Sequence, residues 1–331
     1  TSNDVQKTRV DLIVQVKQLY NSLADIGLKE ISIPSLKPLQ VDFQLCRTLR
    51  GHSAAIYSCD WYDNTLVTCG MDQSLILWNP LKQQKLQLLQ TDQPYNLSVC
   101  FSQQGTQLVT GGLDCAVTLY DIQKSQKQKL YEHFNFVTST KFLSQEKLLS
   151  GSADKTVKVF DLNQQKEELN LAVHFLDVLS IDVLNSQVFA TGSCDGFGRI
   201  FDVRQQKQVQ IFNCQHADCN QIVFHPSRQQ IGMATSLNKF LLYDLRNGQL
   251  LSEFQPQLKS KSVPNMKSVT FSKSGRVAFC AVENKVFCYD LMLGQVVKEV
   301  GEHEQFISQV QVSKNGDCVV SVGWDGLGKV W

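Results

Sequence analysis

The sequence predicts an all-β protein, a seven-bladed propeller preceded by an amino-terminal coiled-coil α-helix. The main observation is that an aromatic residue recurs along the chain, each copy but the last followed by Asp or Asn, at Trp78, Tyr120, Phe160, Phe201, Tyr243, Tyr289 and Trp331. The spacings are 42, 40, 41, 42, 46 and 42 residues. A period of this size, in segments rich in Val, Ile, Leu and Thr, is typical of a four-stranded blade rather than of a helical repeat.

Two further residue types recur in the same phase. Five of the six histidines lie 26 to 28 residues before an aromatic marker: His52, His133, His174, His216 and His303. An Asp lies six residues before the marker in five repeats, at Asp72, Asp114, Asp154, Asp195 and Asp325. Catalytic histidines would not be distributed in this way, so we expect buried polar chains that fix a turn in each blade. The predicted members of these structural tetrads are His52, Thr68, Asp72, Trp78, His133, Ser150, Asp154, His174, Thr191, Asp195, His303, Ser321, Asp325 and Trp331.

The first 40 residues do not fit the repeat and are predicted to form a helix and a linker. Apolar residues recur there at spacings dominated by three and four, at Val5, Leu12, Val16, Leu19, Leu23 and Ile26, which indicates a coiled-coil seam. Gly27 is the expected carboxy-terminal cap. About three heptads are too short to be stable alone. The helix either packs on its own propeller or pairs with a helix of a second chain, and the periodicity does not decide between them.

Residues 41–331 are predicted to form the propeller, closed by a strand at 41–49. The chain stops at Trp331, on what would be the third strand of the seventh blade, so that blade lacks an outer strand. Residues 41–49 alternate apolar and polar side chains, as a half-buried strand does, and can supply it. Three repeats depart from the pattern and should be locally weaker. Blade 2 has no histidine, blade 5 has Asn238 near the expected Asp, and blade 6 has Glu283.

Composition narrows the function. Hydrophobic residues make up 43% of the 331 and charged residues 19%, the balance of a folded chain. The net charge of +1 gives no electrostatic basis for binding nucleic acid or an acidic membrane. The 11 cysteines are scattered and odd in number, which indicates free thiols in a reducing compartment, and the cytoplasm is expected. Cys214, His216 and Cys219 lack a second pair at zinc spacing, so we expect no metal or cofactor.

In a propeller, turns from every blade meet on one flat face, and a partner could bind there. Residues beside each turn Asp or just after each His have no role in the repeat, so apolar or aromatic ones there invite a binding explanation. They are Tyr57, Ile76, Tyr95, Leu97, Leu113, Phe136, Asp177, Leu179, Cys194, Asp218 and Trp324. Trp324, between Gly323 and Asp325, is the clearest candidate anchor because a large aromatic at a turn tip is costly to expose without use.

The repeat resembles the WD-repeat family over residues 46–331. Within it the chain resembles the beta subunit of heterotrimeric G proteins. This likeness rests on the predicted helix with its linker at 24–28, on residues 47–52 and 56–57, and on residues 111–114, 193–195, 268–276, 323–325 and 329–331, which match that family in order. The sequence between these stretches diverges.

The resemblance implies a noncatalytic signalling subunit. It implies that the helix pairs with a small, prenylated gamma subunit, which holds the dimer at the inner face of the plasma membrane. It also implies that the face around Trp324 binds a GDP-bound alpha subunit and, after release, effectors. Lys85 matches a family lysine that contacts the alpha subunit's amino-terminal helix. Ser53, Ala55 and Ser74 stand where the family usually carries a leucine and two lysines, which would weaken or retune docking.

Two other classes of function were weighed against this one. A different WD-repeat scaffold, like a ribosome-associated receptor or a corepressor, would use the helix for self-association without a gamma partner. An enzyme built on a propeller is disfavoured because the sequence has no GxSxG motif and no P-loop. His225 is the one histidine outside the repeat phase; it precedes Pro226 and is predicted to be a surface residue.

Overall fold

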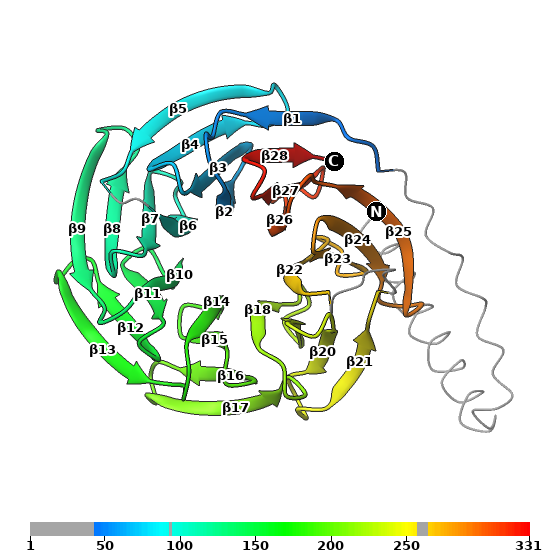
Figure 1. Cartoon of the computed structure of the whole chain (residues 1–331). Helices are drawn as coiled ribbons and strands as arrows, with labels where there is room; N and C mark the ends of the chain where they lie inside the picture. Colours follow the sequence, from blue (N-terminus) through cyan, green and yellow to red (C-terminus); the bar gives the residue numbers. More distant parts are fainter. Residues whose placement is uncertain (1–42, 93–94, 257–263) are drawn as a thin grey trace, which may run out of the picture. The chain divides into compact units, whose positions relative to one another are not determined.

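The structure is a computed structural model that describes residues 43–92, 95–256 and 264–331. Seven four-stranded sheets stand around a central axis in this part of the chain (Figure 1). Each sheet is one blade, so the predicted seven-bladed, all-β architecture is confirmed. The predicted amino-terminal helix, with its seam residues Val5, Leu12, Val16, Leu19, Leu23 and Ile26, lies outside the described residues.

Each blade is a meander of four antiparallel strands, numbered from the axis outward. Blades 1 to 3 consist of β2 (Ile56–Tyr62), β3 (Thr65–Gly70), β4 (Ser74–Asn79), β5 (Gln84–Gln90); β6 (Asn96–Phe101), β7 (Gln107–Gly112), β8 (Ala116–Asp121), β9 (Gln126–Glu132); and β10 (Val137–Phe142), β11 (Lys147–Ser152), β12 (Thr156–Asp161), β13 (Lys166–Ala172). Blades 4 and 5 consist of β14 (Val178–Asn185), β15 (Val188–Ser193), β16 (Phe197–Asp202), β17 (Lys207–Asn213); and β18 (Cys219–Phe224), β19 (Gln230–Thr235), β20 (Phe240–Asp244), β21 (Leu250–Phe254). Blade 6 has β22 (Met266–Phe271), β23 (Val277–Val282), β24 (Lys285–Asp290) and β25 (Gln295–Glu302), and blade 7 has β26 (Ile307–Val312), β27 (Val319–Gly323), β28 (Leu327–Val330) and β1 (Arg47–Arg50).

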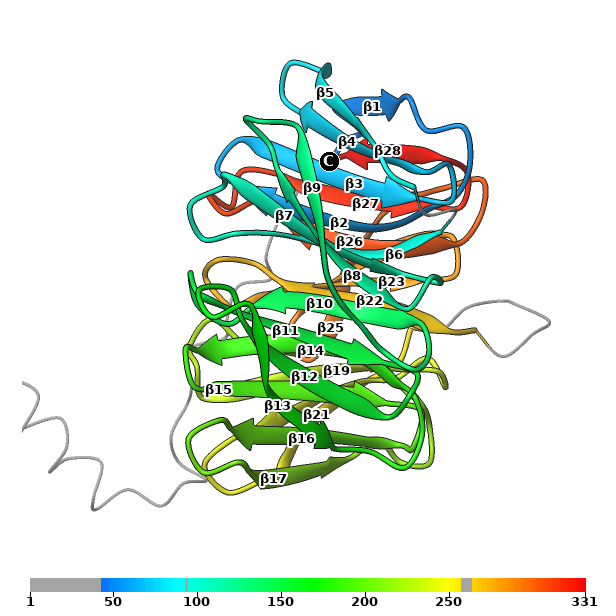
Figure 2. The same cartoon turned by 90° about the vertical axis from the view of Figure 1, so that its left-hand side faces the viewer.

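The position of a strand in its blade determines its residue pattern. The second and third strands of blade 1 are almost entirely buried, because neighbouring blades cover both faces of the sheet. The outer strand β5 is mostly exposed, and outer strands of this kind run along the outside of the ring in Figure 2. The core therefore lies between blades: Val67 and Leu75 of blade 1 belong to one apolar cluster with Val99 and Phe101 of blade 2.

The first and last parts of the propeller close the ring in blade 7. β1 pairs antiparallel with β28, and Leu49 lies opposite Gly328. The closing strand is shorter than the predicted 41–49: residues 43–46 form no strand, and 41–42 lie outside the described residues. The alternating pattern was misleading because Phe43 packs its ring edge to face on Phe279 of blade 6, with centroids 5.2 Å apart, before pairing with β28 begins.

A closed circle of hydrogen bonds joins the seven innermost strands. In each blade a Ser or Gln side-chain oxygen accepts a backbone N–H from the innermost strand of the next blade. The acceptor and donor pairs are Ser58 and Val99 (3.4 Å), Ser98 and Thr140 (2.8 Å), Ser139 and Ile181 (3.1 Å), Ser180 and Ile222 (3.0 Å), Gln221 and Val269 (2.7 Å), Ser268 and Val310 (3.0 Å), and Gln309 and Cys59 (2.8 Å). Because these strands do not pair with one another as a sheet, the circle satisfies buried donors that a blade cannot satisfy alone.

His225 is buried, so the prediction that it is a surface residue is wrong. Its Nε2 donates to the carbonyl oxygen of Gly275 (2.8 Å), and its Nδ1 lies 2.8 Å from the Ser227 hydroxyl. The ring also packs edge to face on Phe271. A His-Pro pair suggests an open turn, but here a turn of blade 6 covers the imidazole and makes it a link between blades 5 and 6. Nowhere in the described chain does a helix combine the length and hydropathy that crossing a bilayer requires.

Candidate protein-binding face

Four blades contain a hydrogen-bonded tetrad. In blade 1, His52 Nδ1 lies 2.8 Å from Asp72 and Nε2 lies 2.7 Å from the Thr68 hydroxyl, to which the Trp78 indole N–H donates (2.9 Å). Blade 7 repeats this with His303, Asp325, Ser321 and Trp331. Blades 3 and 4 use His133 with Asp154 and Ser150, and His174 with Asp195 and Thr191. All four imidazole side chains are fully buried, so they serve the fold and are not available to a substrate.

Each tetrad carboxylate also holds the residue that follows the histidine. Asp72 accepts the backbone N–H of Ser53 at 3.0 Å, and Asp154 accepts that of Phe134 at 3.0 Å. Burial by itself raises the pKa of the Asp72 carboxyl, but hydrogen bonds from His52, Ser74 and the Ser53 N–H outweigh it and lower the pKa to about 2. The ionised carboxylate therefore fixes the turn and directs the next side chain out of the blade.

The tetrad of blade 4 has an additional cation. Phe201 has no N–H to donate, and Arg199 instead places Nη1 2.7 Å from Asp195 and in contact with His174 Nδ1. Burial lowers the pKa of His174, the Asp195 carboxylate opposes this, and the Arg199 cation lowers it further, to about 4. His174 is therefore neutral at physiological pH. In blade 3 the missing indole is replaced in another way, since the Tyr131 hydroxyl lies 2.8 Å from Ser150.

Blade 5 lacks a tetrad, although His216 is in phase with the other histidines. His216 is exposed, with a positive φ of 64°. Asn238, near the expected Asp, is buried and donates its side-chain amide to the Pro256 carbonyl at 3.1 Å. Cys214 and Cys219 are both buried, so the grouping that resembled a metal site is divided between the core and the surface.

One backbone hydrogen bond recurs in all seven blades and brings two turns together. The residue after the second strand donates its N–H to a carbonyl just before the first strand. The pairs are Met71 and Ala55, Leu113 and Tyr95, Ala153 and Phe136, Cys194 and Asp177, Ser236 and Asp218, Glu283 and Asn265, and Trp324 and Phe306, at 2.9 to 3.2 Å. At Gly112 the approach is so close that a Cβ atom would lie 2.1 Å from the Tyr95 oxygen. These paired turns, together with the tetrads, form one surface of the ring, which we call the tetrad face.

Trp324 stands at the edge of a pocket on the tetrad face. It is 43% exposed, and its ring packs edge to face between Tyr57 and Phe306, with centroids 6.3 and 5.6 Å away. The pocket has a volume of about 430 Å³ and is also lined by Leu97, Lys267 and Glu283. Burial, and to a lesser degree the neighbouring Tyr95, raise the pKa of the Tyr57 phenol. The pocket is thus an apolar recess with a neutral hydroxyl and two charged side chains at its border.

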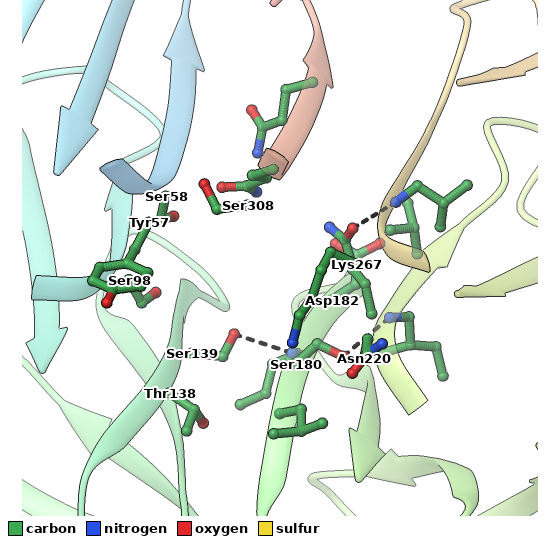
Figure 3. A pocket seen from close by; sticks show the side chains of 18 of the residues that line it. Tyr57, Ser58, Ser98, Thr138, Ser139, Ser180, Asp182, Asn220, Lys267 and Ser308 are labelled. Carbon is green, nitrogen blue, oxygen red and sulfur yellow. Dashed lines mark hydrogen bonds between the residues drawn. The ribbon is translucent and has the colours of Figure 1, made fainter. Parts of the chain in front are cut away.

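The central channel beside this pocket is polar. Hydroxyl and amide side chains from different blades point into it, among them Ser58, Ser98, Thr138, Ser180 and Asn220 (Figure 3). The cavity has a volume of about 270 Å³. Several of these hydroxyls accept the inter-blade bonds described above, as the dashed lines at Ser139 and Ser180 show. The channel lining is therefore largely occupied in holding the ring together.

Two acidic side chains lie on the tetrad face at blades 4 and 5. Burial raises the pKa of the Cys194 thiol to about 11, and the nearby Asp218 and Asp177 carboxylates contribute to the shift. The thiol is therefore protonated at neutral pH and is a poor nucleophile. Neither carboxylate has an ion-pair partner in the described part of the chain. This acidic corner is available to a cationic group of a partner.

Most of the predicted binding residues lie together on this surface. Tyr57, Tyr95, Leu97, Asp177, Leu179, Cys194 and Asp218 are partly exposed, and Leu113, Phe136 and Trp324 are more fully exposed. Ile76 does not belong to this surface: it is fully buried in β4, in the cluster that contains Trp78, so its assignment is wrong. A position beside the turn Asp can point inward, because side chains alternate along the strand that starts there. Lys85 is exposed on the outer strand β5, at the side of blade 1.

The substitutions flagged in the sequence differ in their environment. Ser74 is buried and donates its hydroxyl to Asp72 at 2.7 Å, so this side chain supports the turn and does not face a partner. Ser53 is exposed and Ala55 is partly exposed, so these two positions do present less apolar and less cationic surface.

Sequence reasoning missed four exposed apolar residues on the tetrad face. Phe134 is 93% exposed and Phe175 is 79% exposed, and each directly follows a tetrad histidine. Leu176 and Phe306 are about half exposed in the equivalent segments of blades 4 and 7. The available signal was the position itself, since the residue after a tetrad histidine is held outward by the tetrad carboxylate.

Comparison with known proteins agrees with this geometry. A family model described as "WD domain, G-beta repeat" matches residues 43–79, 94–121, 124–161 and 294–331. Proteins named guanine nucleotide-binding protein subunit beta are similar over 88% of the chain. The one from Oryza sativa subsp. japonica is 29% identical over 317 residues, which is 83% of its length, and the one from Arabidopsis thaliana is 29% identical over 316 residues, 84% of its length.

Seven blades held by tetrads, together with the repeat match, define a WD-repeat propeller. Within that class the chain is a divergent relative of the G protein beta subunits, the proteins that it resembles over nearly nine tenths of its length.

Proposed function

We propose that this chain is a noncatalytic beta subunit of a heterotrimeric G protein. It forms an obligate dimer with a prenylated gamma subunit through residues 1–40, binds a GDP-bound alpha subunit through the tetrad face, and binds effectors when alpha leaves. The names of its relatives support the class of protein, and the absence of charge bias on the whole chain fits binding to proteins rather than to nucleic acid. Membrane contact, at the inner face of the plasma membrane, would come through the lipidated partners.

The observation that carries the proposal is the way Trp324 is held. Its turn is fixed from three sides: Asp325 is in the blade 7 tetrad, the Trp324 N–H donates to Phe306 at 2.9 Å, and Tyr57 supports the ring. A rigid aromatic beside an apolar recess loses little entropy on binding, which is the usual property of a hot spot. Nothing in the repeat requires a tryptophan there, so a binding role explains it best.

The mechanism would be mutual exclusion on one surface. An alpha subunit in its GDP form and an effector would both use the Trp324 pocket, and the change in alpha on binding GTP would remove its complementarity to that pocket. A noncatalytic role is supported by the chemistry of the face. The tetrad imidazoles are buried in hydrogen bonds, and the Cys194 thiol is protonated.

The test is the substitution Trp324→Ala in the full chain purified with its gamma subunit. Loss of the buried contact should cost about 2 kcal/mol, which is about 30-fold in affinity for a GDP-bound alpha subunit. Met292→Ala is the matched control, because Met292 is 62% exposed but lies in the turn between β24 and β25, away from the tetrad turns. Isothermal titration calorimetry measures both affinities, and thermal melting checks the fold. Equal affinity of wild type and Trp324→Ala would contradict the proposed face.

The alternative is a WD-repeat scaffold that assembles without a gamma partner. The mass of the native particle separates the two: a small copurifying chain supports the G protein beta subunit, and a homo-oligomer of this chain supports the scaffold.

A further inference from the structure

Two neighbouring blades hold a group of large apolar side chains outside the fold. Phe134 and Phe136 lie between β9 and β10, and Phe175 and Leu176 lie between β13 and β14. Their exposed fractions are 93%, 42%, 79% and 47%, respectively. We call these four residues the blade 3–4 patch. Phenylalanines exposed to this degree, side by side on a folded protein, usually mark a contact with another molecule.

The patch is ordered by the scaffold beneath it. Asp154 accepts the N–H of Phe134 and Asp195 accepts that of Phe175, at 3.0 and 3.1 Å. The Arg199 guanidinium lies 5.8 Å from the centre of the Phe175 ring and supports it from the tetrad. The two segments are also joined, because the Thr138 hydroxyl donates to the Val178 carbonyl of the next blade. The rings are therefore presented by two tetrads.

The charges around the patch show what kind of segment would cover it. Asp177 directly follows Leu176, and Asp218 lies near it beside Cys194. Neither carboxylate has an ion-pair partner in the described ranges. The facing cations are Lys155, which is exposed, and Arg199, which is buried and paired with Asp195. Apolar rings beside two uncompensated carboxylates and one lysine favour a partner segment that is apolar and cationic.

The location of the patch adds a geometric condition. Figure 1 shows β10 and β14 across the central axis from β26 and β28, so the patch and the Trp324 pocket lie on opposite sides of the channel mouth. A partner that uses both must span the mouth of the channel. Two separated anchors fix the orientation of a partner more strictly than one can.

We propose that the blade 3–4 patch is a second anchor site of the tetrad face. It binds an amphipathic segment in which aliphatic or aromatic side chains cover Phe134 and Phe175 and an adjacent Arg or Lys faces Asp177 and Asp218. The same partner also occupies the Trp324 pocket. This inference rests on the proposed function, because it takes the tetrad face to be the surface that binds the alpha subunit.

The experiment uses the full chain with its gamma subunit and a GDP-bound alpha subunit as the probe. The double variant Phe134→Thr with Phe175→Thr should bind at least about tenfold more weakly by biolayer interferometry. Val209→Thr is the matched control, since Val209 is 60% exposed on the outer strand β17 and should leave affinity unchanged. Thermal melting should show no loss of stability in either variant, because the substituted side chains are exposed.

Each outcome decides a different statement. If Trp324→Ala weakens binding but the double variant does not, the second anchor is refuted and the proposed function stands. If the wild-type chain binds no alpha subunit, the proposed function fails, and a phage-displayed library of random peptides selected on the wild-type chain tests the patch directly. Apolar, basic peptides that lose binding to the double variant would support the anchor. Selected peptides that all bind the double variant as well as the wild type would overturn it.

Discussion

Replacing Leu49 by alanine should destabilise the whole propeller, although the change lies in a four-residue strand. Leu49 is 1% exposed and belongs to a cluster with Ile56 and Trp61 of blade 1 and Val320 and Val330 of blade 7. Buried Leu→Ala substitutions cost roughly 2 to 5 kcal/mol, and this fully enclosed site should cost about 3 kcal/mol. For a domain of this size that lowers the melting temperature by about 6 °C.

The matched control is Leu45→Ala, four residues earlier in the same segment. Leu45 is 48% exposed and precedes the paired strand, so its truncation should change the melting temperature little. Thermal melting and urea unfolding, followed by circular dichroism, compare the two variants. If the closure of blade 7 holds the ring together, Leu49→Ala should shift a single cooperative transition. Equal melting temperatures for the two variants would refute the reasoning.

Two other predictions concern the inner circle of bonds and the blade 4 tetrad. Ser180→Ala removes the acceptor of the Ile222 N–H and should cost about 1 to 2 kcal/mol in urea unfolding, whereas Ser186→Ala, at an exposed turn, should cost nothing measurable; equal costs would argue against the circle. His174 has a pKa of about 4 in the folded chain and near 6.5 when unfolded, so the stability from keeping it neutral is complete above about pH 6.5 and is lost as the pH falls toward 4. The loss is at most about 3 kcal/mol. His174→Gln should flatten this part of the urea midpoint profile against pH, and an unchanged slope would show that another group titrates there.

The repeat made the architecture predictable, because each blade needs the same polar turn and the same apolar strands. The aromatic marker and the in-phase histidines gave the seven blades, and the incomplete last repeat pointed to closure by the segment before the first. The details failed where a side chain served a contact outside its own blade. Phe43 alternates with polar neighbours as a strand residue would, yet it packs on Phe279 of blade 6. His225 looked like a turn residue and is covered by blade 6.

The candidate site was predictable to the extent that the turns obey the repeat. Trp324 could be placed at a turn tip because Asp325 belongs to the tetrad pattern. Ile76 was assigned wrongly, because the sequence does not show which of two neighbouring side chains at a strand entrance points inward. Phe134 and Phe175 were missed because the hydrogen bond from the backbone N–H after the histidine to the tetrad carboxylate is a feature of the folded turn. The inner circle of Ser and Gln acceptors was missed for the same reason.

The most direct test of the account is the nucleotide dependence of alpha-subunit binding. The full chain with its gamma subunit is immobilised, and the affinity of an alpha subunit is measured by biolayer interferometry with GDP and then with a nonhydrolysable GTP analogue. A G protein beta subunit that works by mutual exclusion should bind the GDP form and release the GTP form, with Trp324→Ala weakening the first. Equal binding of both forms, or binding of neither, would contradict the account.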